Sequence, residues 1–380
     1  MIVEKLSNKI DIQKFLKELG VDGGGVNILA SKSEIHLVHI KELSVGGANI
    51  LKQDALSIGA DLAVPRGTVL ALKPKVDVLL IASTRHLEIL AKKELAQPFG
   101  LKELADKLKQ FTKIQKPKTV EIMGVLNAND DSFFSKSRLN KQEALERIES
   151  MIAEGANIID LGGVSSAPNS ALVTVQEELS RVEPIFELIK EKKLYEKVDF
   201  SIDSYEPKVI ESALKAGFTI VNDITGLAND EVCRLCAKYN ATAVIMHMQG
   251  TPQTMQKSPH YENLLSEVYA FFQERVAKAE HFGINNIILD IGLGFGKTLE
   301  DNLMLLKNLE HFLSLDKPLL VGASRKSMID KITPTKIEDR LAGTLTLHQE
   351  ALQNGAQILR VHDVKEHYQL MKIFQALQKI

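Results

Sequence analysis

Short apolar, β-branched runs in this sequence repeatedly end in residue types that can do chemistry. The polar residues at or just after the ends of eight such runs are Asn127, Asp160, Asp203, Asn222, Asp223, His247, Asp290, Ser324, Arg325, Lys326, Ser327, Arg360, His362 and Asp363. Ionised groups at the end of a buried run are costly unless they are paired or used. For any one of them a satisfied core residue is an equally good explanation, but packing alone hardly explains eight runs that all end in this way.

Two kinds of binding chemistry are present in this set. The carboxylates and amides that could exchange hydrogen bonds with a polar heterocycle are Asp203, Asn222 and Asp290. The groups that could hold an anion such as a phosphate are Arg325, Lys326, Arg360 and, when protonated, His362. The set therefore favours a ligand with a polar ring and a negatively charged group.

Two motifs that would suggest other chemistry are weak. GLGFGKT at 292–298 resembles a P-loop, but Ile291 stands where that loop needs a Gly. We expect instead a loop whose glycines let the backbone closely approach a ligand. Cys233 and Cys236 have C-x-x-C spacing, but no second ligand pair for zinc lies nearby, and the spacing falls within a helical pattern. We therefore expect two small helical residues in a reducing compartment.

The polar ends can meet only if the runs are strands of one sheet. The runs cover residues 119–127, 157–163, 197–203, 219–226, 242–248, 286–294, 318–324 and 357–363. Helical stretches with apolar residues at three- and four-residue spacing separate them. Eight strand–helix units in about 260 residues predict a closed parallel (β/α)₈ TIM barrel, whose active site lies at the carboxyl ends of the strands. An open doubly wound sheet is the alternative, with a usual strand number nearer six.

The first 115 residues do not show this regular strand–helix alternation, and their pattern predicts a smaller α/β domain. Residues 36–43 and 76–83 read as strands, and residues 46–64 and 100–111 as helices. The glycines at 23–25 read as a flexible loop. Residues 113–119 are polar with one Pro and predict a linker. We therefore divide the chain into an α/β extension, 1–115, and a barrel, 116–380.

Composition excludes several classes of protein. Lys and Arg total 47 against 49 Asp and Glu, so no general attraction to nucleic acid is expected. No run of about 18 apolar residues is present, and the N-terminus lacks the apolar region of a signal peptide. We expect a cytoplasmic protein with no membrane or nucleic-acid partner.

Taken together in order, the motifs resemble those of the dihydropteroate synthase family. The matching segments are MGVLNANDDSFF, IIDLGGVSSAP, SIDSYEPKV, VNDITG, MHMQGTPQTMQ, DIGLGFGKTLEDN, GASRKS and RVHDV. The resemblance covers roughly residues 118–370. Residues 1–115 are outside the common family core and resemble an extension seen in some bacterial members, for which the resemblance implies no function.

The resemblance implies a reaction of folate biosynthesis. The amine of 4-aminobenzoate displaces diphosphate from (7,8-dihydropterin-6-yl)methyl diphosphate, and 7,8-dihydropteroate and diphosphate are formed. A pterin pocket is implied at Asp203, Asn222, Asp290 and Lys326. A diphosphate site is implied at Asn127, Arg360 and His362, and contacts to 4-aminobenzoate at Ser166, Pro168, Phe295 and Ser327. Mg²⁺ at Asn127 and a homodimer are also implied. The catalytic set would be Asp203, Lys326, Asn127, Arg360 and His362.

Two loops depart from the family pattern. Asn129 and Asp130 replace Thr-Pro in the first, and Ala167 replaces the Arg of the second. The pocket residues are intact, which favours an active synthase. The alternatives are a methyltetrahydrofolate methyltransferase type of barrel, which has no use for a diphosphate site, a non-catalytic or altered paralogue that binds a pterin or phosphate, and a barrel without a site.

Overall fold

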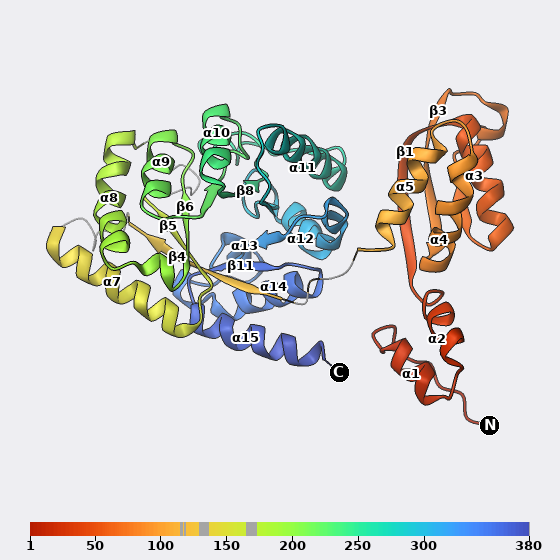
Figure 1. Ribbon diagram of the computed structural model, residues 1–380, viewed down its shortest axis with the longest axis horizontal. Helices are drawn as coiled ribbons and strands as arrows, with labels where there is room; N and C mark the ends of the chain where they lie inside the picture. The colour runs from red at the N-terminus through yellow and green to blue at the C-terminus, as the bar shows by residue number, and fades with distance from the viewer. Residues whose placement is uncertain (115–116, 118, 129–136, 165–172, 380) are drawn as a thin grey trace. The chain divides into compact units, whose positions relative to one another are not determined.

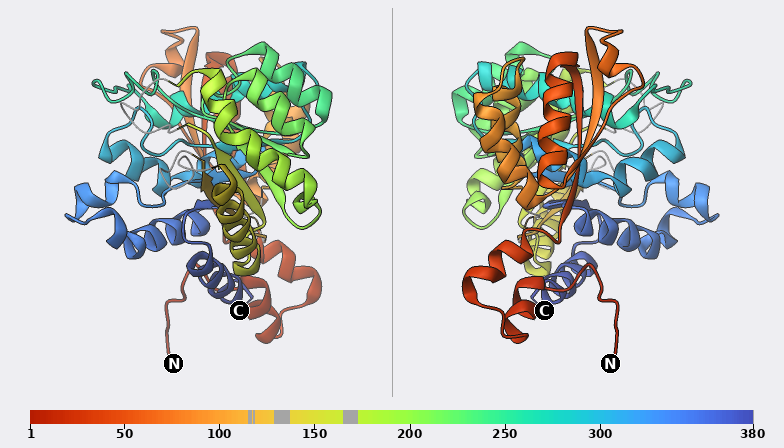
Figure 2. Two further views of the ribbon diagram at one scale, coloured as in Figure 1. Left: turned by 90° about the vertical axis from the view of Figure 1, so that its left-hand side faces the viewer. Right: turned by 90° about the vertical axis from the view of Figure 1, so that its right-hand side faces the viewer.

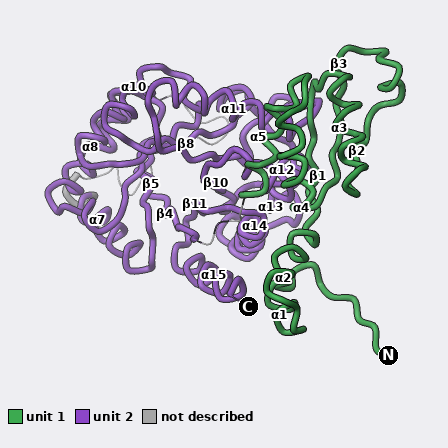
Figure 3. The backbone as a smooth tube through the Cα atoms, turned by 45° about the vertical axis from the view of Figure 1, so that its right-hand side comes forward, with its two compact units in different colours: residues 1–115, 380 green, residues 116–379 purple. Residues whose placement is uncertain are grey.

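The computed structural model describes residues 1–114, 117, 119–128, 137–164 and 173–379. Its contacts divide the chain into two compact units, residues 1–115 with residue 380, and residues 116–379, which Figure 3 shows in green and purple. Each unit has a hydrophobic core of its own. Within the described residues no helix is long and apolar enough to cross a membrane.

The second unit is the predicted closed (β/α)₈ barrel, with all eight strands parallel. The strands are β4 (Glu121–Asn127), β5 (Ile158–Gly162), β6 (Asp199–Asp203), β7 (Ile220–Asp223), β8 (Thr242–Met246), β9 (Ile287–Asp290), β10 (Leu319–Val321) and β11 (Ile358–Val361). Each strand pairs with the next in sequence, and β11 pairs with β4 to close the barrel. The fold predicted from strand–helix alternation is confirmed.

Helices connect the strands and surround them (Figure 1; Figure 2). They are α7 (Ser137–Glu154), α8 (Val175–Glu191), α9 (Pro207–Lys215), α10 (Asp230–Tyr239), α11 (Leu264–His281), α12 (Leu299–Lys307), α13 (Ser327–Ile332), α14 (Leu341–Gln353) and α15 (Val364–Leu377). Cys233 and Cys236 lie buried and free on α10, so the prediction of two ordinary helical residues is confirmed.

The barrel strands bury side chains on both faces, which explains their nearly continuous apolar sequences. A large core lies between strands and helices. A separate small cluster takes one residue from each of seven strands: Met123, Ile158, Ile220, Val244, Ile288, Leu320 and Ile358. Because successive residues of a strand point to opposite faces, this cluster is a layer inside the barrel. It forms the apolar floor below the strand ends.

The first unit is a three-stranded antiparallel sheet with helices packed against it. Its strands β1 (Ile35–Ser44), β2 (Asp61–Ala63) and β3 (Lys75–Ser83) lie in the order β1-β3-β2. Its helices are α1 (Ile12–Glu18), α2 (Gly23–Ala30), α3 (Val45–Ile58), α4 (Thr84–Lys93) and α5 (Leu101–Phe111). The core combines leucines of α3, α4 and α5 with inward residues of the strands.

Three details of the predicted extension are wrong. The glycines at 23–25 begin α2 instead of forming a loop, because Asp22 caps the helix and accepts a hydrogen bond from the Gly24 N–H. The helix predicted over 46–64 ends at Ile58, where Gly59 adopts a left-handed conformation with φ 87°. Asp61–Ala63 then forms β2, and α4 was not predicted at all.

Candidate active site

The strand ends bring polar side chains together above the apolar floor. Asp160, Asn222, Asp290 and Arg360 each lie two residues beyond a member of the interior layer. The period of two therefore turns each of them into the barrel, one layer nearer the carboxyl ends. In the strand register, Asp203 lies opposite Gly162 on one side and Asn222 on the other.

One guanidinium holds two carboxylates at the centre of this layer. Arg360 donates from Nε to Asp160 at 2.6 Å and from a terminal nitrogen to Asp203 at 2.6 Å. Asn222 donates to the same oxygen of Asp160 at 3.1 Å, while the other Asp160 oxygen is buried with no hydrogen-bond partner among the described residues. Burial, opposed by Arg360 and assisted by Asp160, raises the pKa of Asp203 to about 7. At least one acceptor of this layer therefore has no donor among the described residues.

Asp290 and Lys326 lie on the other side of the layer and are tied to one loop, Gly292–Gly296. Asp290 accepts from the Gly292 N–H at 2.8 Å, and Lys326 donates to the Leu293 carbonyl. The Lys326 ammonium also lies 4.5 Å from the centre of the Phe295 ring. Burial, opposed by Asp290, lowers the pKa of Lys326 to about 8.

The glycines of this loop are required by close backbone approach. Gly292 has φ 61°, and a Cβ there would lie 2.0 Å from the His247 carbonyl oxygen. The buried Lys297 donates to the carbonyls of His247, Gly292 and Phe295 at 3.2, 3.0 and 2.9 Å. In the structure the loop makes a tight contact with the end of β8, which fixes the place of Phe295. Its close approach to a ligand stays a prediction.

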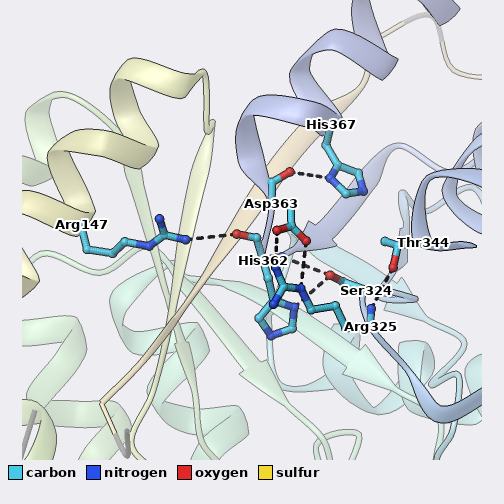
Figure 4. A network of polar contacts seen from close by, with 7 residues as sticks. All are labelled: Arg147, Ser324, Arg325, Thr344, His362, Asp363 and His367. Carbon is cyan, nitrogen blue, oxygen red and sulfur yellow. Dashed lines mark hydrogen bonds and ion pairs between the residues drawn. The ribbon is translucent and has the colours of Figure 1, made fainter. Parts of the chain in front are cut away.

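A pocket of about 460 Å³ opens beside the ends of β4 and β11. It is lined by Val125, Leu126, Asn127, Arg147, Arg325, His362 and Asp363. Figure 4 shows how its polar groups are connected. Arg325 pairs through two nitrogens with the carboxylate of Asp363. His362 binds the Ser324 hydroxyl through Nδ1 at 2.9 Å.

Arg325 is held in an unusual backbone conformation. Its φ is 56°, and its N–H donates to the Thr344 hydroxyl at 3.0 Å. Arg340 donates to its carbonyl at 3.1 Å. A non-Gly residue in this region costs about 1–3 kcal/mol, and such residues cluster at functional sites. The surrounding bonds therefore fix the segment from Ser324 to Lys326.

The structure places the predicted residues in two groups. The predicted pterin residues Asp203, Asn222, Asp290 and Lys326 belong to the layer inside the barrel, together with Arg360. Asn127 and His362 line the pocket, but Arg360, predicted beside them, does not. Phe295 is half-buried next to Lys326, and Ser327 is exposed as the first residue of α13. Ser166, Pro168, Ala167, Asn129 and Asp130 lie outside the described residues.

Sequence reasoning missed three residues of this region. Asp160 was noted at a strand end but not assigned to the site, although its offset of two from Ile158 marks it as inward-facing. Lys297 was read only as part of a glycine motif. Arg147 lies on α7, away from any strand end, and no local signal in the sequence points to it.

Within the described residues no three His, Cys, Asp or Glu side chains group closely enough to hold a metal ion. Among the described residues that line the pocket, the amide oxygen of Asn127 is one possible ligand, whereas the carboxylate of Asp363 is paired with Arg325. Mg²⁺ commonly binds through one or two protein oxygens together with water and substrate phosphates. The residues therefore fit a Mg²⁺ ion that arrives with a diphosphate, and do not form a metal cage of their own.

Comparisons with known proteins agree on one family. The family model described as pterin binding enzyme matches residues 123–362. The bifunctional dihydropteroate synthase/dihydropteroate reductase of Helicobacter pylori is 44% identical over 379 residues, spanning 100% of both chains. The dihydropteroate synthase of Haemophilus influenzae is 40% identical over 67% of this chain and 93% of its own. Among solved structures, dihydropteroate synthase from Thermus thermophilus in complex with 4-aminobenzoate has 38% identity and a TM-score of 0.61, covering 68% of this chain and 95% of that one.

Proposed function

Because the chain belongs to the dihydropteroate synthase family of pterin binding enzymes, we propose that its barrel is a transferase that joins a pterin to 4-aminobenzoate. The substrates would be (7,8-dihydropterin-6-yl)methyl diphosphate and 4-aminobenzoate, and the products 7,8-dihydropteroate and diphosphate. The amine nitrogen forms a bond to the pterin methylene carbon as the carbon–oxygen bond to diphosphate breaks. The observation that carries the proposal is the layer of buried and partly buried polar residues at the strand ends: Asp160, Asp203, Asn222, Asp290 and Lys326.

This layer is suited to the edge of a pterin. The 2-amino-4-oxo edge presents neighbouring donors and an acceptor, and the layer offers carboxylate and amide oxygens with the Lys326 ammonium as a donor. Loss of diphosphate leaves positive charge on the pterin methylene, which buried carboxylates such as Asp203 and Asp290 stabilise. No covalent attachment to the protein is needed, and both cysteines lie on α10, away from the strand ends.

The second substrate would lie nearer the rim of the barrel. Phe295 offers an aromatic face in the loop Gly292–Gly296, whose position Lys297 fixes by hydrogen bonds. Ser327 offers a hydroxyl at the start of α13. Ser166 and Pro168 are proposed to complete this contact. The leaving diphosphate is proposed to bind at the pocket beside Asn127 and His362. Mg²⁺, bound there with Asn127 as one ligand, would neutralise charge on the diphosphate.

Product analysis separates this proposal from the non-catalytic paralogue. The purified chain should form dihydropteroate from the two substrates, whereas a binding paralogue would bind the pterin and make no product. The intact polar layer and the named relatives support a catalytic synthase over a non-catalytic paralogue that only binds the pterin. A methyltransferase type of barrel would leave the Asn127 pocket without a use.

Pterin binding should depend on pH with a maximum between the pKa values of Asp203 and Lys326. The carboxylate accepts best when ionised, so affinity should rise as pH increases through about 7, the raised pKa of Asp203. The ammonium donates only while protonated, so affinity should fall as pH increases through about 8, the lowered pKa of Lys326. Titration of 6-hydroxymethyl-7,8-dihydropterin from about pH 6 to about pH 9 checks this.

The control for this prediction is Lys326→Arg, whose guanidinium stays charged throughout the range. In this variant, pterin affinity should no longer fall at alkaline pH but should still fall at acidic pH. A flat profile in the wild type would show that neither group governs pterin binding.

A second activity is proposed for residues 1–115. The Helicobacter pylori relative is named a bifunctional synthase and reductase, and its match spans these residues, whereas the match to the Haemophilus influenzae synthase covers only 67% of this chain. We propose that this unit reduces dihydropteroate. The reduction adds a hydride and a proton across the C=N bond that remains in the partly reduced pyrazine ring of the dihydropterin, and the hydride requires a donor such as a reduced nicotinamide or flavin.

Separating the two units should separate the two activities. Residues 116–380 include all eight strands, the large core and every predicted site residue, so they should fold alone and keep synthase activity. They should not oxidise reduced nicotinamide in the presence of dihydropteroate, with or without added flavin, whereas the full chain should. Retained reduction in the shortened protein would place the second activity in the barrel. An insoluble or inactive product with several start points would show that the first unit completes the fold.

Two further proposals concern the cell and the assembly. We propose a cytoplasmic enzyme, because its proposed substrates are small folate precursors, and a homodimer, as the family resemblance implies. Light scattering of the purified chain at several concentrations measures the oligomeric state directly.

A further inference from the structure

The pocket beside Asn127 is lined by positively charged side chains that were not among the predicted diphosphate residues. Arg360, predicted to bind the diphosphate, is held by Asp160 and Asp203 at 2.6 Å each. His362 is neutral at pH 7, since burial, together with Arg360 and Arg325, lowers its pKa to about 4. Neither residue therefore brings an uncompensated positive charge to the pocket in the free protein.

The remaining cations that line the pocket are Arg325 and Arg147. Arg325 forms a double contact with the carboxylate of Asp363, so the pair has no net charge. Arg147 is different. It is exposed on α7, and a terminal nitrogen donates to the backbone carbonyl of His362 at 3.1 Å. No carboxylate within the described part of the chain pairs with it.

The contact to His362 also fixes where the guanidinium lies. It joins residues 215 positions apart in sequence and holds the Arg147 side chain at the end of β11, as Figure 4 shows. A guanidinium has five N–H donors in a planar fork, so the bond to the carbonyl leaves others for an anion. Forked donors of this kind match phosphate oxygens better than a single ammonium does.

We propose that Arg147 is a substrate-binding residue that supplies the net positive charge for the diphosphate group, next to Asn127 and His362. This inference rests on the proposed function, because it assigns the pocket to the diphosphate of that reaction. Arg360 then has a separate task, which is to hold Asp160 and Asp203 in the pterin layer.

The test is calorimetric titration of inorganic diphosphate with Mg²⁺ into the full chain and its variants. Arg147→Ala should weaken binding about ten- to one-hundredfold, the usual effect of losing a hydrogen bond to a charged group. Arg147→Gln keeps a polar hydrogen-bond donor on α7 but has no charge, so it should weaken binding as much as Ala. Arg147→Lys should recover part of the affinity.

The matched control is Lys141→Ala, which removes one positive charge from the same helix. Lys141 pairs with Glu187 on the surface and does not line the pocket. It should bind diphosphate like the wild type. Affinity for 6-hydroxymethyl-7,8-dihydropterin should stay unchanged in all variants, which shows that the barrel is intact.

The outcomes separate the inference from the proposed function. Wild-type affinity in Arg147→Gln would overturn the role of the charge and leave the synthase proposal standing. A wild type that binds diphosphate, loses it on Arg147→Gln, but makes no dihydropteroate would support the anion site and overturn the proposed reaction. A wild type that binds no diphosphate would overturn both.

Discussion

Replacing Asp203 or Lys326 by Ala is expected to lower kcat/KM for dihydropteroate formation by about 10³-fold or more, with the barrel still folded. Removal of one preorganised group that stabilises developing charge typically costs about 10²–10³ in rate, and these residues also bind the pterin ring. Asp203 supplies a largely buried carboxylate and Lys326 a partly buried ammonium at the strand ends of the barrel. Steady-state kinetics with both substrates measure the loss.

A control on the same strand tests the position as well as the charge. Asp199 stands at the opposite end of β6, where it accepts a hydrogen bond from Thr219 at 3.3 Å. Asp199→Ala should keep nearly wild-type kcat/KM. A variant at Asp203 that has a wild-type circular dichroism spectrum and nearly wild-type kcat/KM would remove that residue from the site.

Replacing Arg360 by Met is expected to lower the free energy of unfolding by about 3–5 kcal/mol at pH 8. Removing one partner of a buried ion pair leaves the other charge uncompensated, and here the carboxylates of both Asp160 and Asp203 lose their cation. The cost should shrink as pH falls. In the wild type, burial already raises the pKa of Asp203 to about 7 against the opposing effect of Arg360. Without Arg360 the charged form of Asp203 is still less favourable in the folded state, and this cost disappears when the carboxyl is protonated.

Urea unfolding of wild type and Arg360→Met at about pH 8 and about pH 6 measures this difference. The double variant Asp160→Asn with Arg360→Met should recover part of the stability, because one of the two unpaired carboxylates has been neutralised. A loss below about 1 kcal/mol that does not change with pH would contradict the view that Arg360 neutralises this layer.

The barrel and the strand-end positions of its polar residues could be predicted from the sequence because both depend on short-range patterns, whereas the assignment of four of these residues to a pterin pocket came from the family resemblance. Strand–helix alternation defines the fold, and an offset of two from an interior residue turns Asp160, Asn222 and Asp290 inward. The pairing of Arg360 could not be predicted in the same way. Arg360 is 200 positions from Asp160 and 157 positions from Asp203 in the sequence. Whether a strand-end arginine faces a carboxylate or a ligand depends on how the barrel closes.

In residues 1–115, a local sequence preference led to a wrong prediction. Three consecutive glycines favour a loop by propensity, yet Asp22 and the packing of Val26 and Ala30 stabilise a helix there. Tertiary contacts outweigh a weak local preference in this segment. Arg147 escaped prediction for a related reason, since a charged residue on an exposed helix face is usually only solvated, and its place beside His362 follows from the packing of α7 in the barrel.

The central claim is that the strand-end layer and the neighbouring pocket together exchange diphosphate for an amine. Its most direct test is diphosphate release from (7,8-dihydropterin-6-yl)methyl diphosphate by the purified full chain, measured with Mg²⁺ in the presence and absence of 4-aminobenzoate. We predict one diphosphate released for each dihydropteroate formed, and release that depends on 4-aminobenzoate. No release, or release at the same rate without the amine, would contradict the account.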